Sequence, residues 1–293
     1  MPSFSSCALR ALQVVLIMVP AALRINAAIP DTVKPVPPKQ VITTDFSAIG
    51  PRTFQTLEGL SNRQSVYEGS LSFLQRQPIR EGPWYWGWGV RSEVYSFYNR
   101  SRYPVDHLQD YAAQASLEYF VGAEPVASLT LYPGFYFVND PTLSAWDVPF
   151  ELVSGIPITN ALSGVIGVDY ARFYRYPTPI AGFSWTMNPK VRFDLVYPNP
   201  AVVVALKKNM EARLAGELIG GGFRTPLING RTHVEYYEYR VGAHVSAEIM
   251  PGLKVIGGAG YVMDRVFNFL PNSLRDPVGG APFIHLGLEL SRY

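Results

Sequence analysis

The sequence of 293 residues contains a single cysteine, Cys7, which precedes an apolar run near the N-terminus. If that end is removed on export, the remaining chain has no thiol. It then has no disulfide framework and no cysteine-based metal site. Cys7 also lies on the wrong side of the apolar run to accept a lipoprotein anchor.

Long hydrophobic runs are scarce as well. The run at 11–23 follows Arg10 and is shorter than the ~20 residues that a spanning helix needs. The small residue Ala27 then fits a cleavage site, so residues 1–27 are expected to be a signal peptide, with an N-terminal membrane anchor as the alternative. No later stretch is long enough for a helical span. A membrane location would therefore require a closed β-barrel, in which every backbone group is bonded within the protein.

Charge is sparse, at 16% of residues with a formal net charge of +2. Soluble domains usually carry ~25% charged residues. The near-neutral balance gives no reason to expect nucleic acid or an acidic partner.

Catalytic and cofactor motifs are missing from the sequence. The four histidines, His107, His233, His244 and His285, show no metal-ligand spacing. There is no Gly-x-Ser-x-Gly motif, and the glycines at 220–222 lack the lysine and following helix of a phosphate loop. We therefore expect no enzyme activity, cofactor or metal. The enzymatic alternative, a membrane-embedded lipid hydrolase or acyltransferase, would need Ser, His and Asp or Asn clustered at one rim.

What the sequence does contain is a two-residue alternation of apolar and polar side chains. Tyr237, Tyr239 and Val241 alternate with Glu238 and Arg240. The same pattern occurs at 190–197 and 209–218. Since successive side chains of a strand point to opposite faces, each of these segments has one greasy and one charged face. The pattern predicts a sheet between an apolar medium and a wet or polar interior.

Strands are expected near 52–60 (weak), 65–76, 84–97, 110–121, 126–138, 147–156, 161–174, 179–186, 190–197, 201–206, 210–224, 233–250, 253–267 and 281–293. Tight connections at 124–125, 188–189, 207–208 and 251–252 tend to alternate with longer ones at 98–109, 139–146, 225–232 and 268–280. Outer-membrane barrels show this alternation. The short 197–200 connection and the long 77–83 connection fit it less well.

Aromatic residues, 13% of the chain, gather near the ends of the expected strands. Trp84, Trp86 and Trp88 share one strand face. Amphipathic rings favour the headgroup level of a membrane, where they form girdles. The alternative is the aromatic core of a soluble, secreted β-sandwich that binds carbohydrate.

The second strand face is expected to line the lumen. The expected lining residues are Glu118, Asp169, Arg192, Asp194, Glu211, Arg213, Glu217, Glu238, Arg240, His244 and Glu248. Buried unpaired charge is costly, so these groups must pair or the lumen must hold water. Four carboxylates, at 211, 217, 238 and 248, would face two arginines, at 213 and 240. This sector predicts modest cation selectivity if the pore is open.

The C-terminus departs from the usual ending of such barrels. Tyr293 supplies a terminal aromatic residue, but Leu286, Leu288 and Leu290 are offset from it by one position. Either a β-bulge lies near Arg292, or Tyr293 is not a standard assembly signal.

Four segments carry a family resemblance: 195–200 (LVYPNP), 216–221 (GELIGG), 238–241 (EYRV) and 259–265 (AGYVMDR). In this order and spacing they resemble a family of predicted outer-membrane β-barrels known only as a domain of unknown function, over roughly 60–293. The resemblance implies a fold and a location, and no activity or catalytic residues.

Together these observations predict an all-β fold, a single antiparallel up-and-down transmembrane β-barrel of 12–14 strands. The expected organisation is a signal peptide at 1–27, a Pro-rich periplasmic linker or plug at 28–50 and the barrel at 51–293. The expected location is the cell outer membrane, with outer-membrane lipid and the barrel-assembly machinery as partners. The expected function is a porin-like pore for an unknown substrate, with a non-conducting structural or adhesive barrel as a further alternative. The oligomeric state is left open.

Overall fold

The computed structural model describes residues 37–293 except 56–58, 60, 81, 100–104, 122–123, 172, 174–175, 229–230 and 271–273. The expected signal peptide at 1–27 lies outside the described residues. Within them, no helix is long and apolar enough to cross a bilayer.

The described chain is almost entirely β-strand. The strands are β1 (Gln40–Gln55), β2 (Ser61–Pro78), β3 (Trp84–Asn99), β4 (His107–Val121), β5 (Glu124–Leu131), β6 (Gly134–Val138), β7 (Trp146–Asp147), β8 (Phe150–Pro157), β9 (Leu162–Tyr170), β10 (Thr178–Asn188), β11 (Val191–Tyr197), β12 (Ala201–Lys207), β13 (Met210–Ile228), β14 (Arg231–Met250), β15 (Leu253–Leu270), β16 (Leu274–Pro277) and β17 (Ala281–Arg292). A 3-10 turn, η1 (Leu143–Ala145), precedes β7.

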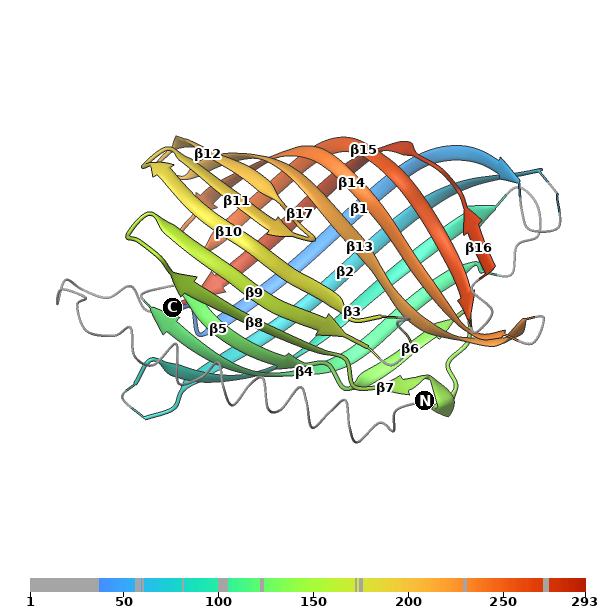
Figure 1. The fold of residues 1–293 in the computed structure, drawn as a ribbon, viewed down its shortest axis with the longest axis horizontal. Coiled ribbons are helices and arrows are strands. Elements are labelled where there is room, and N and C mark those ends of the chain that lie inside the picture. Colours follow the sequence, from blue (N-terminus) through green and yellow to red (C-terminus); the bar gives the residue numbers. More distant parts are fainter. Residues whose placement is uncertain are drawn as a thin grey trace.

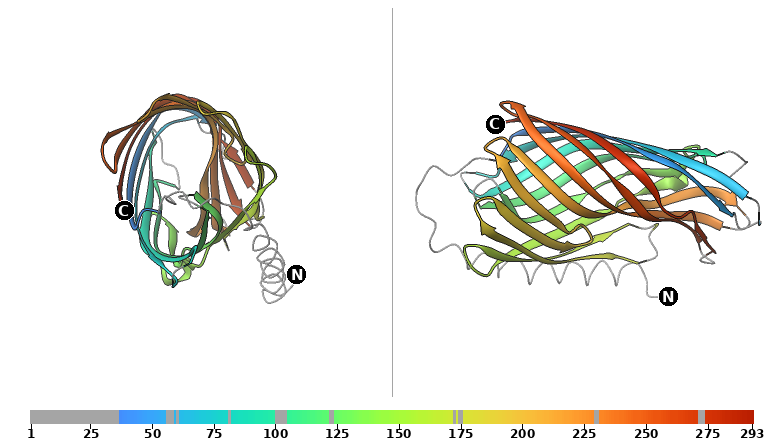
Figure 2. Two further views of the ribbon diagram at one scale, coloured as in Figure 1. Left: turned by 90° about the vertical axis from the view of Figure 1, so that its left-hand side faces the viewer. Right: turned by 90° about the horizontal axis from the view of Figure 1, so that it is seen from above.

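These strands form one closed antiparallel barrel with a wall of 14 strands. β5 and β6 both pair with β4, and β16 and β17 both pair with β15, so each couple is one interrupted wall strand. β7 and β8 likewise continue one another along β6 and β5. β17 pairs with β1 and closes the ring (Figures 1 and 2). The expected fold class is confirmed.

The first strand begins earlier than the sequence pattern predicts. Residues 40–50, expected in the linker or plug, belong to β1, which pairs with β17 and β2. The weak strand expected at 52–60 overlaps only the end of β1, at 52–55, and residues 56–58 and 60 lie outside the described residues. Thr44 and Ala48 share the face of Ile42 and Phe46, so the apolar side of β1 is diluted and its alternation is weak.

The tight connections lie at the end of the barrel where β1 begins. Three of the four expected ones join β10 to β11, β12 to β13 and β14 to β15. The fourth, expected at 124–125, is instead the start of β5. The connection expected at 225–232 is mostly strand, because β13 continues to Ile228 and β14 starts at Arg231. The β11–β12 connection contains only the residues 198–200, although it lies at the opposite end.

The two faces of the wall separate as the alternation predicts. Leu214 on β13 is 57% exposed and Leu286 on β17 is 60% exposed, whereas Glu238 and Arg240 on β14 are buried. β17 pairs with β1 in continuous register from Phe283 to Arg292, so no bulge offsets the C-terminal leucines. Tyr293 follows directly after this strand, at the alternate position shared with inward-facing Phe283 and His285.

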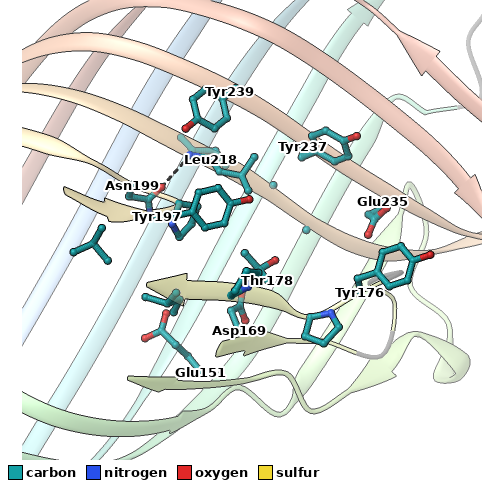
Figure 3. Close-up of a pocket in the computed structure, with 18 of the residues that line it drawn as sticks. Glu151, Asp169, Tyr176, Thr178, Tyr197, Asn199, Leu218, Glu235, Tyr237 and Tyr239 are labelled. Carbon is teal, nitrogen blue, oxygen red and sulfur yellow. Dashed lines mark hydrogen bonds between the residues drawn. The ribbon is translucent and has the colours of Figure 1, made fainter. Parts of the chain in front are cut away.

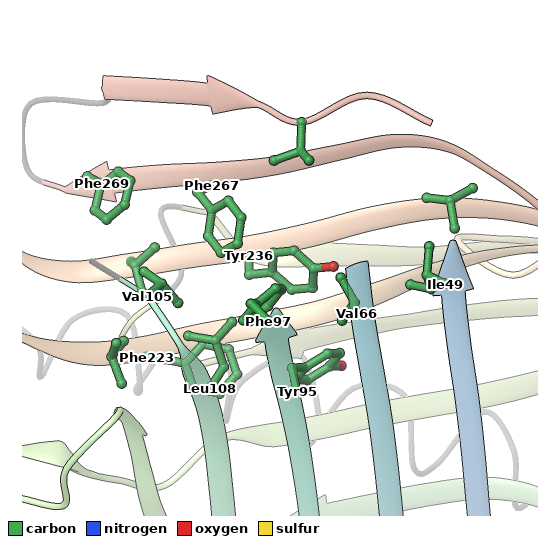
Figure 4. Packing of buried hydrophobic residues seen from close by; sticks show 14 of the residues in the cluster. Ile49, Val66, Tyr95, Phe97, Val105, Leu108, Phe223, Tyr236, Phe267 and Phe269 are labelled. Atoms are coloured by element: carbon green, nitrogen blue, oxygen red, sulfur yellow. The ribbon is translucent and has the colours of Figure 1, made fainter. Parts of the chain in front are cut away.

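Apolar side chains fill part of the barrel interior. Tyr95 and Phe97 on β3 contact Tyr236 on β14, with ring centroids 5.3 Å apart in both pairs. Phe97 also contacts Phe267 on β15 at 5.2 Å (Figure 4). Since β15, β17, β1 and β2 separate β14 from β3 in the wall, these rings meet across the interior. The aromatic plug, defined by these four rings, narrows the axial path toward the end where β1 finishes.

A candidate site in the barrel wall

The pairing between β12 and β13 ends partway along β13. β12 pairs with β13 only from Met210 to Ala215, and β13 then continues to Ile228. Beyond the ladder, Gly216 N–H donates to Pro200 O at 2.8 Å, and Leu218 N–H donates to Asn199 Oδ1 at 2.9 Å. These bonds show that even-numbered amides of β13 point toward β12. From Gly220 onward the described β12 offers no strand partner to this edge.

The opposite lip of the same gap is the start of β10. β11 pairs with β10 from Ala181 onward, so Thr178 to Ile180 lack a β11 partner. Pro179 lies on this lip and has no N–H, which suits an unpaired strand edge. β9 pairs with the same residues on their other side, so the lip itself remains part of the sheet.

The wall closes again above the gap. Phe137 on β6 pairs with Arg224 on β13, so β6 and β13 are neighbours there without the intervening strands. Arg224 Nε donates to Ser144 Oγ at 3.2 Å, which ties β13 to η1. A Cβ atom on Gly222 would lie 2.5 Å from the backbone of Phe173, so this glycine allows the β9–β10 connection to pack against β13. The gap is therefore a bounded window.

A cavity of about 890 Å³ occupies the window (Figure 3). Some lining residues have inward parity, including Glu151, Asp169 and Ile219. Others have outward parity, including Tyr197 and Leu218. Both faces of the wall therefore contribute side chains to one cavity.

Acidic and tyrosine side chains dominate the polar lining. The carboxylates come from Glu151, Asp169, Glu235 and Asp264, and the tyrosines are Tyr176, Tyr197, Tyr236, Tyr237 and Tyr239. Among the described residues that line the cavity there is no lysine, arginine or histidine. The window is thus an acidic, aromatic opening.

A buried ion cluster lies next to the aromatic plug. Arg240 on β14 is 2% exposed and forms ion pairs with Glu238 on its own strand and Glu68 on β2. Its Nη1 donates to Ser47 Oγ on β1 at 3.2 Å, and its guanidinium lies 5.3 Å from the Phe283 ring. The cluster links β14 to β1 and β2, which are not its neighbours in the wall, and it lies beside the aromatic plug.

Ser47, His285 and Asp45 form a chain of contacts that bears on the enzymatic alternative. Ser47 Oγ lies 3.1 Å from His285 Nδ1, and His285 Nε2 lies 3.4 Å from Asp45 Oδ1. However, Ser47 is only 3% exposed and its oxygen already accepts from Arg240. The arrangement also lies inside the barrel rather than at the rim that the enzymatic alternative requires.

The residues expected to line the lumen fall into three groups. Glu238, Arg240 and His244 are buried around the ion cluster, and Glu217 lies 4.0 Å from His244 Nε2. Asp169 lines the window. The remainder lie elsewhere on the inward face: Glu118 bonded to Arg76 at 2.7 Å, Arg192 bonded to Asp194 at 2.9 Å, exposed Glu211 and Arg213, and Glu248.

The expected sector of four glutamates is not one cluster. The Glu248 side chain accepts from Gly252 N–H at 2.9 Å at a tight turn, far along β14 from Glu238. Arg240 pairs with Glu238 and Glu68 instead of Glu217. Sequence reasoning missed Glu68, Ser47 and Glu151, because contacts across a lumen leave no periodic signal in either strand.

Comparisons with known proteins bear on the fold. No family model and no curated protein matches the chain. A crystal structure of an outer membrane channel from Pseudomonas putida F1 matches over 90% of this chain and 100% of that one, with 11% identity and a TM-score of 0.50. The chain has the fold of an outer-membrane β-barrel. The translocator domain of the autotransporter NalP from Neisseria meningitidis matches over 99% of this chain and 98% of that one, with 8% identity and a TM-score of 0.31. The resemblance to a specific uncharacterised family stays a prediction.

Proposed function

We propose that this protein is an outer-membrane channel that passes small solutes through the window in its wall. The observation that carries the proposal is the cavity lined from both faces of the wall, where β13 continues past β12. A volume of about 890 Å³ fits a small organic molecule, since pockets for such ligands typically measure roughly 300–1,000 Å³. The similar structure from Pseudomonas putida F1 is also described as an outer membrane channel.

The aromatic plug supports a lateral route over an axial one. Rings from opposite sides of the barrel contact each other, with centroids 5.2–5.3 Å apart, so a solute moving along the axis meets packed side chains. Tyr236 belongs to the plug and also lines the window. A solute can therefore leave the lumen beside the plug without displacing it.

Exposed tyrosines at the window support a position for its outer mouth at the membrane surface. Tyr197 is 46% exposed and Tyr176 is 66% exposed, and both line the cavity. Tyrosines favour the membrane–water interface, so the outer mouth is placed at headgroup level in this proposal. The expected export signal and outer-membrane location belong to the same proposal.

A thiol block with a matched control tests the route. In a Cys7→Ser background, Thr178→Cys places a thiol at the window, and Thr186→Cys places one on the same strand and the same inward face, outside the cavity lining. Each variant is reacted with a bulky methanethiosulfonate reagent after folding. Solute entry is then measured by swelling of liposomes that contain the protein.

Modification at Thr178→Cys is expected to reduce swelling several-fold, and modification at Thr186→Cys to change it little. Equal swelling before and after modification of Thr178→Cys, with labelling verified by mass, would contradict a route through the window. Absence of swelling in the unmodified protein would favour the non-conducting structural barrel.

A further inference from the structure

We propose that the window is a binding site for organic cations, namely small molecules with an ammonium group on an apolar body. The inference rests on the proposed route through the wall and adds the chemical class of its solute. It combines the size of the cavity, its acidic lining and its tyrosine rings.

The inner part of the cavity holds a pair of carboxylates. Glu151 on β8 and Asp169 on β9 lie directly opposite each other on neighbouring strands. Both have inward parity, and Figure 3 shows both side chains at the cavity. Like charges directly opposite in a sheet repel, and either a bound proton or a cation between them relieves the repulsion.

The residues that the structure describes supply little positive charge to this pair. Arg91 attracts both carboxylates, but it already forms ion pairs with Asp110 at 3.0 Å and Glu93 at 3.4 Å. One guanidinium thus serves four carboxylates. When both carboxyl groups are ionised, the pair carries negative charge that a ligand cation can neutralise.

The outer part of the cavity adds two further acids. Glu235 accepts from Asn268 Nδ2 at 3.1 Å, and Asp264 pairs with Arg275 at 3.2 Å. A cation entering from outside meets carboxylates along the whole cavity.

The tyrosines provide the second half of the recognition. Tyr197, Tyr237 and Tyr239 lie around the mouth, contributed by β11 and β14 (Figure 3). Aromatic faces attract ammonium groups through the ring quadrupole, and aromatic cages bind quaternary ammonium ligands. Rings also accept the apolar body of the same molecule. An anion of equal size would make the same ring contacts, but the carboxylates would repel it.

Equilibrium binding to the full-length protein in dodecyl maltoside tests the charge preference. The probes are benzyltrimethylammonium, benzyl alcohol and phenylacetate, which share a ring and differ in charge. Calorimetric titration is expected to give the cation an affinity at least about tenfold higher than the other two. Similar affinities for all three, or a preference for phenylacetate, would overturn the proposal.

Two variants separate the site from general charge. The double variant Glu151→Gln with Asp169→Asn is expected to weaken cation binding at least about tenfold. Glu211→Gln removes an inward carboxylate outside the cavity lining and is expected to leave binding within about twofold. Unchanged cation binding in the folded double variant would overturn the assignment to this pair.

Two sources of ammonium groups are distinguished by repeating the titration in nanodiscs. The two nanodiscs carry the same fraction of phosphatidylglycerol, so that the surface charge is equal, and differ in whether the remaining lipid is phosphatidylethanolamine or an uncharged glycolipid. Weaker binding with phosphatidylethanolamine than with the glycolipid would assign the site to a lipid headgroup, and equal binding would assign it to a free solute. Thiol modification at Thr178→Cys tests the route independently. If that modification stops swelling while all three probes bind equally, the channel stands and the charge preference is wrong.

Discussion

Replacing Arg240 by methionine should destabilise the folded barrel more than any other single loss of charge among the described ion pairs. Arg240 is 2% exposed and pairs with two acids, Glu68 and Glu238. Methionine keeps much of the side-chain volume beside Phe283. The substitution therefore removes the charge and leaves two carboxylates facing each other in a dry part of the barrel.

The expected loss follows from the burial of the partners. Removing one member of a buried ion pair costs about 3–5 kcal/mol, because the remaining charge is left uncompensated. Glu238 is fully buried and Glu68 is 9% exposed, so neither regains water easily. The control is Arg192→Met, whose side chain is 46% exposed in its pair with Asp194. Exposed pairs contribute about 0–1 kcal/mol.

The assay is reversible urea unfolding of each variant in lipid vesicles, followed by the gel shift between folded and unfolded barrel. Arg240→Met combined with Glu68→Gln and Glu238→Gln should recover part of the loss, since the stranded charges are gone. An Arg240→Met protein within about 1 kcal/mol of the wild type, or no less stable than Arg192→Met, would refute the reasoning.

Four further outcomes are expected. Leu214→Arg places a charge on the outward face and should cost ~2–4 kcal/mol at mid-membrane, whereas Arg213→Leu on the inward face should be tolerated; equal yields of folded protein would show the register is wrong. Phe97→Ala removes the one ring that lies 5.2–5.3 Å from Phe267 and Tyr236 and should raise single-channel conductance, while Tyr98→Ala on the outward face should not. N-terminal sequencing of exported protein should start near Ala28, and an intact Met1 in the membrane fraction would contradict cleavage. Bilayer recordings under a salt gradient should give a cation-selective reversal potential, and an anion-selective one would reject the acidic lining of the conducting path.

The sequence was sufficient for the class of fold and for the two faces of the wall. The alternation at 233–250 places Glu238 and Arg240 on one side and Tyr239 and Val241 on the other, as the structure does. The alternation predicts the faces correctly because it depends only on neighbouring residues, and because the two faces of the wall contact different surroundings. The start of β1 was missed because Thr44 and Ala48 dilute its apolar side.

The window could not be predicted from alternation. The one related feature of the sequence is the short 197–200 connection, where a long loop is expected. That short connection does not show that the pairing of β12 with β13 ends early. The ion cluster was hidden for a different reason. Glu68 and Arg240 are 172 positions apart and meet across the interior, so their pairing depends on the closure of the whole barrel.

Hydrogen exchange of two adjacent glycine amides tests the window most directly. The Gly216 and Leu218 bonds show that even-numbered amides of β13 face the β12 side, so the Gly220 amide faces the window and the Gly221 amide faces β14. Amides without a ladder partner exchange faster than paired ones. Residue-resolved exchange in detergent micelles should show Gly220 exchanging at least about a hundredfold faster than Gly221 and Leu214. Equal, slow exchange at Gly220 and Gly221 would mean that the edge of β13 is paired, the wall is continuous, and no window exists.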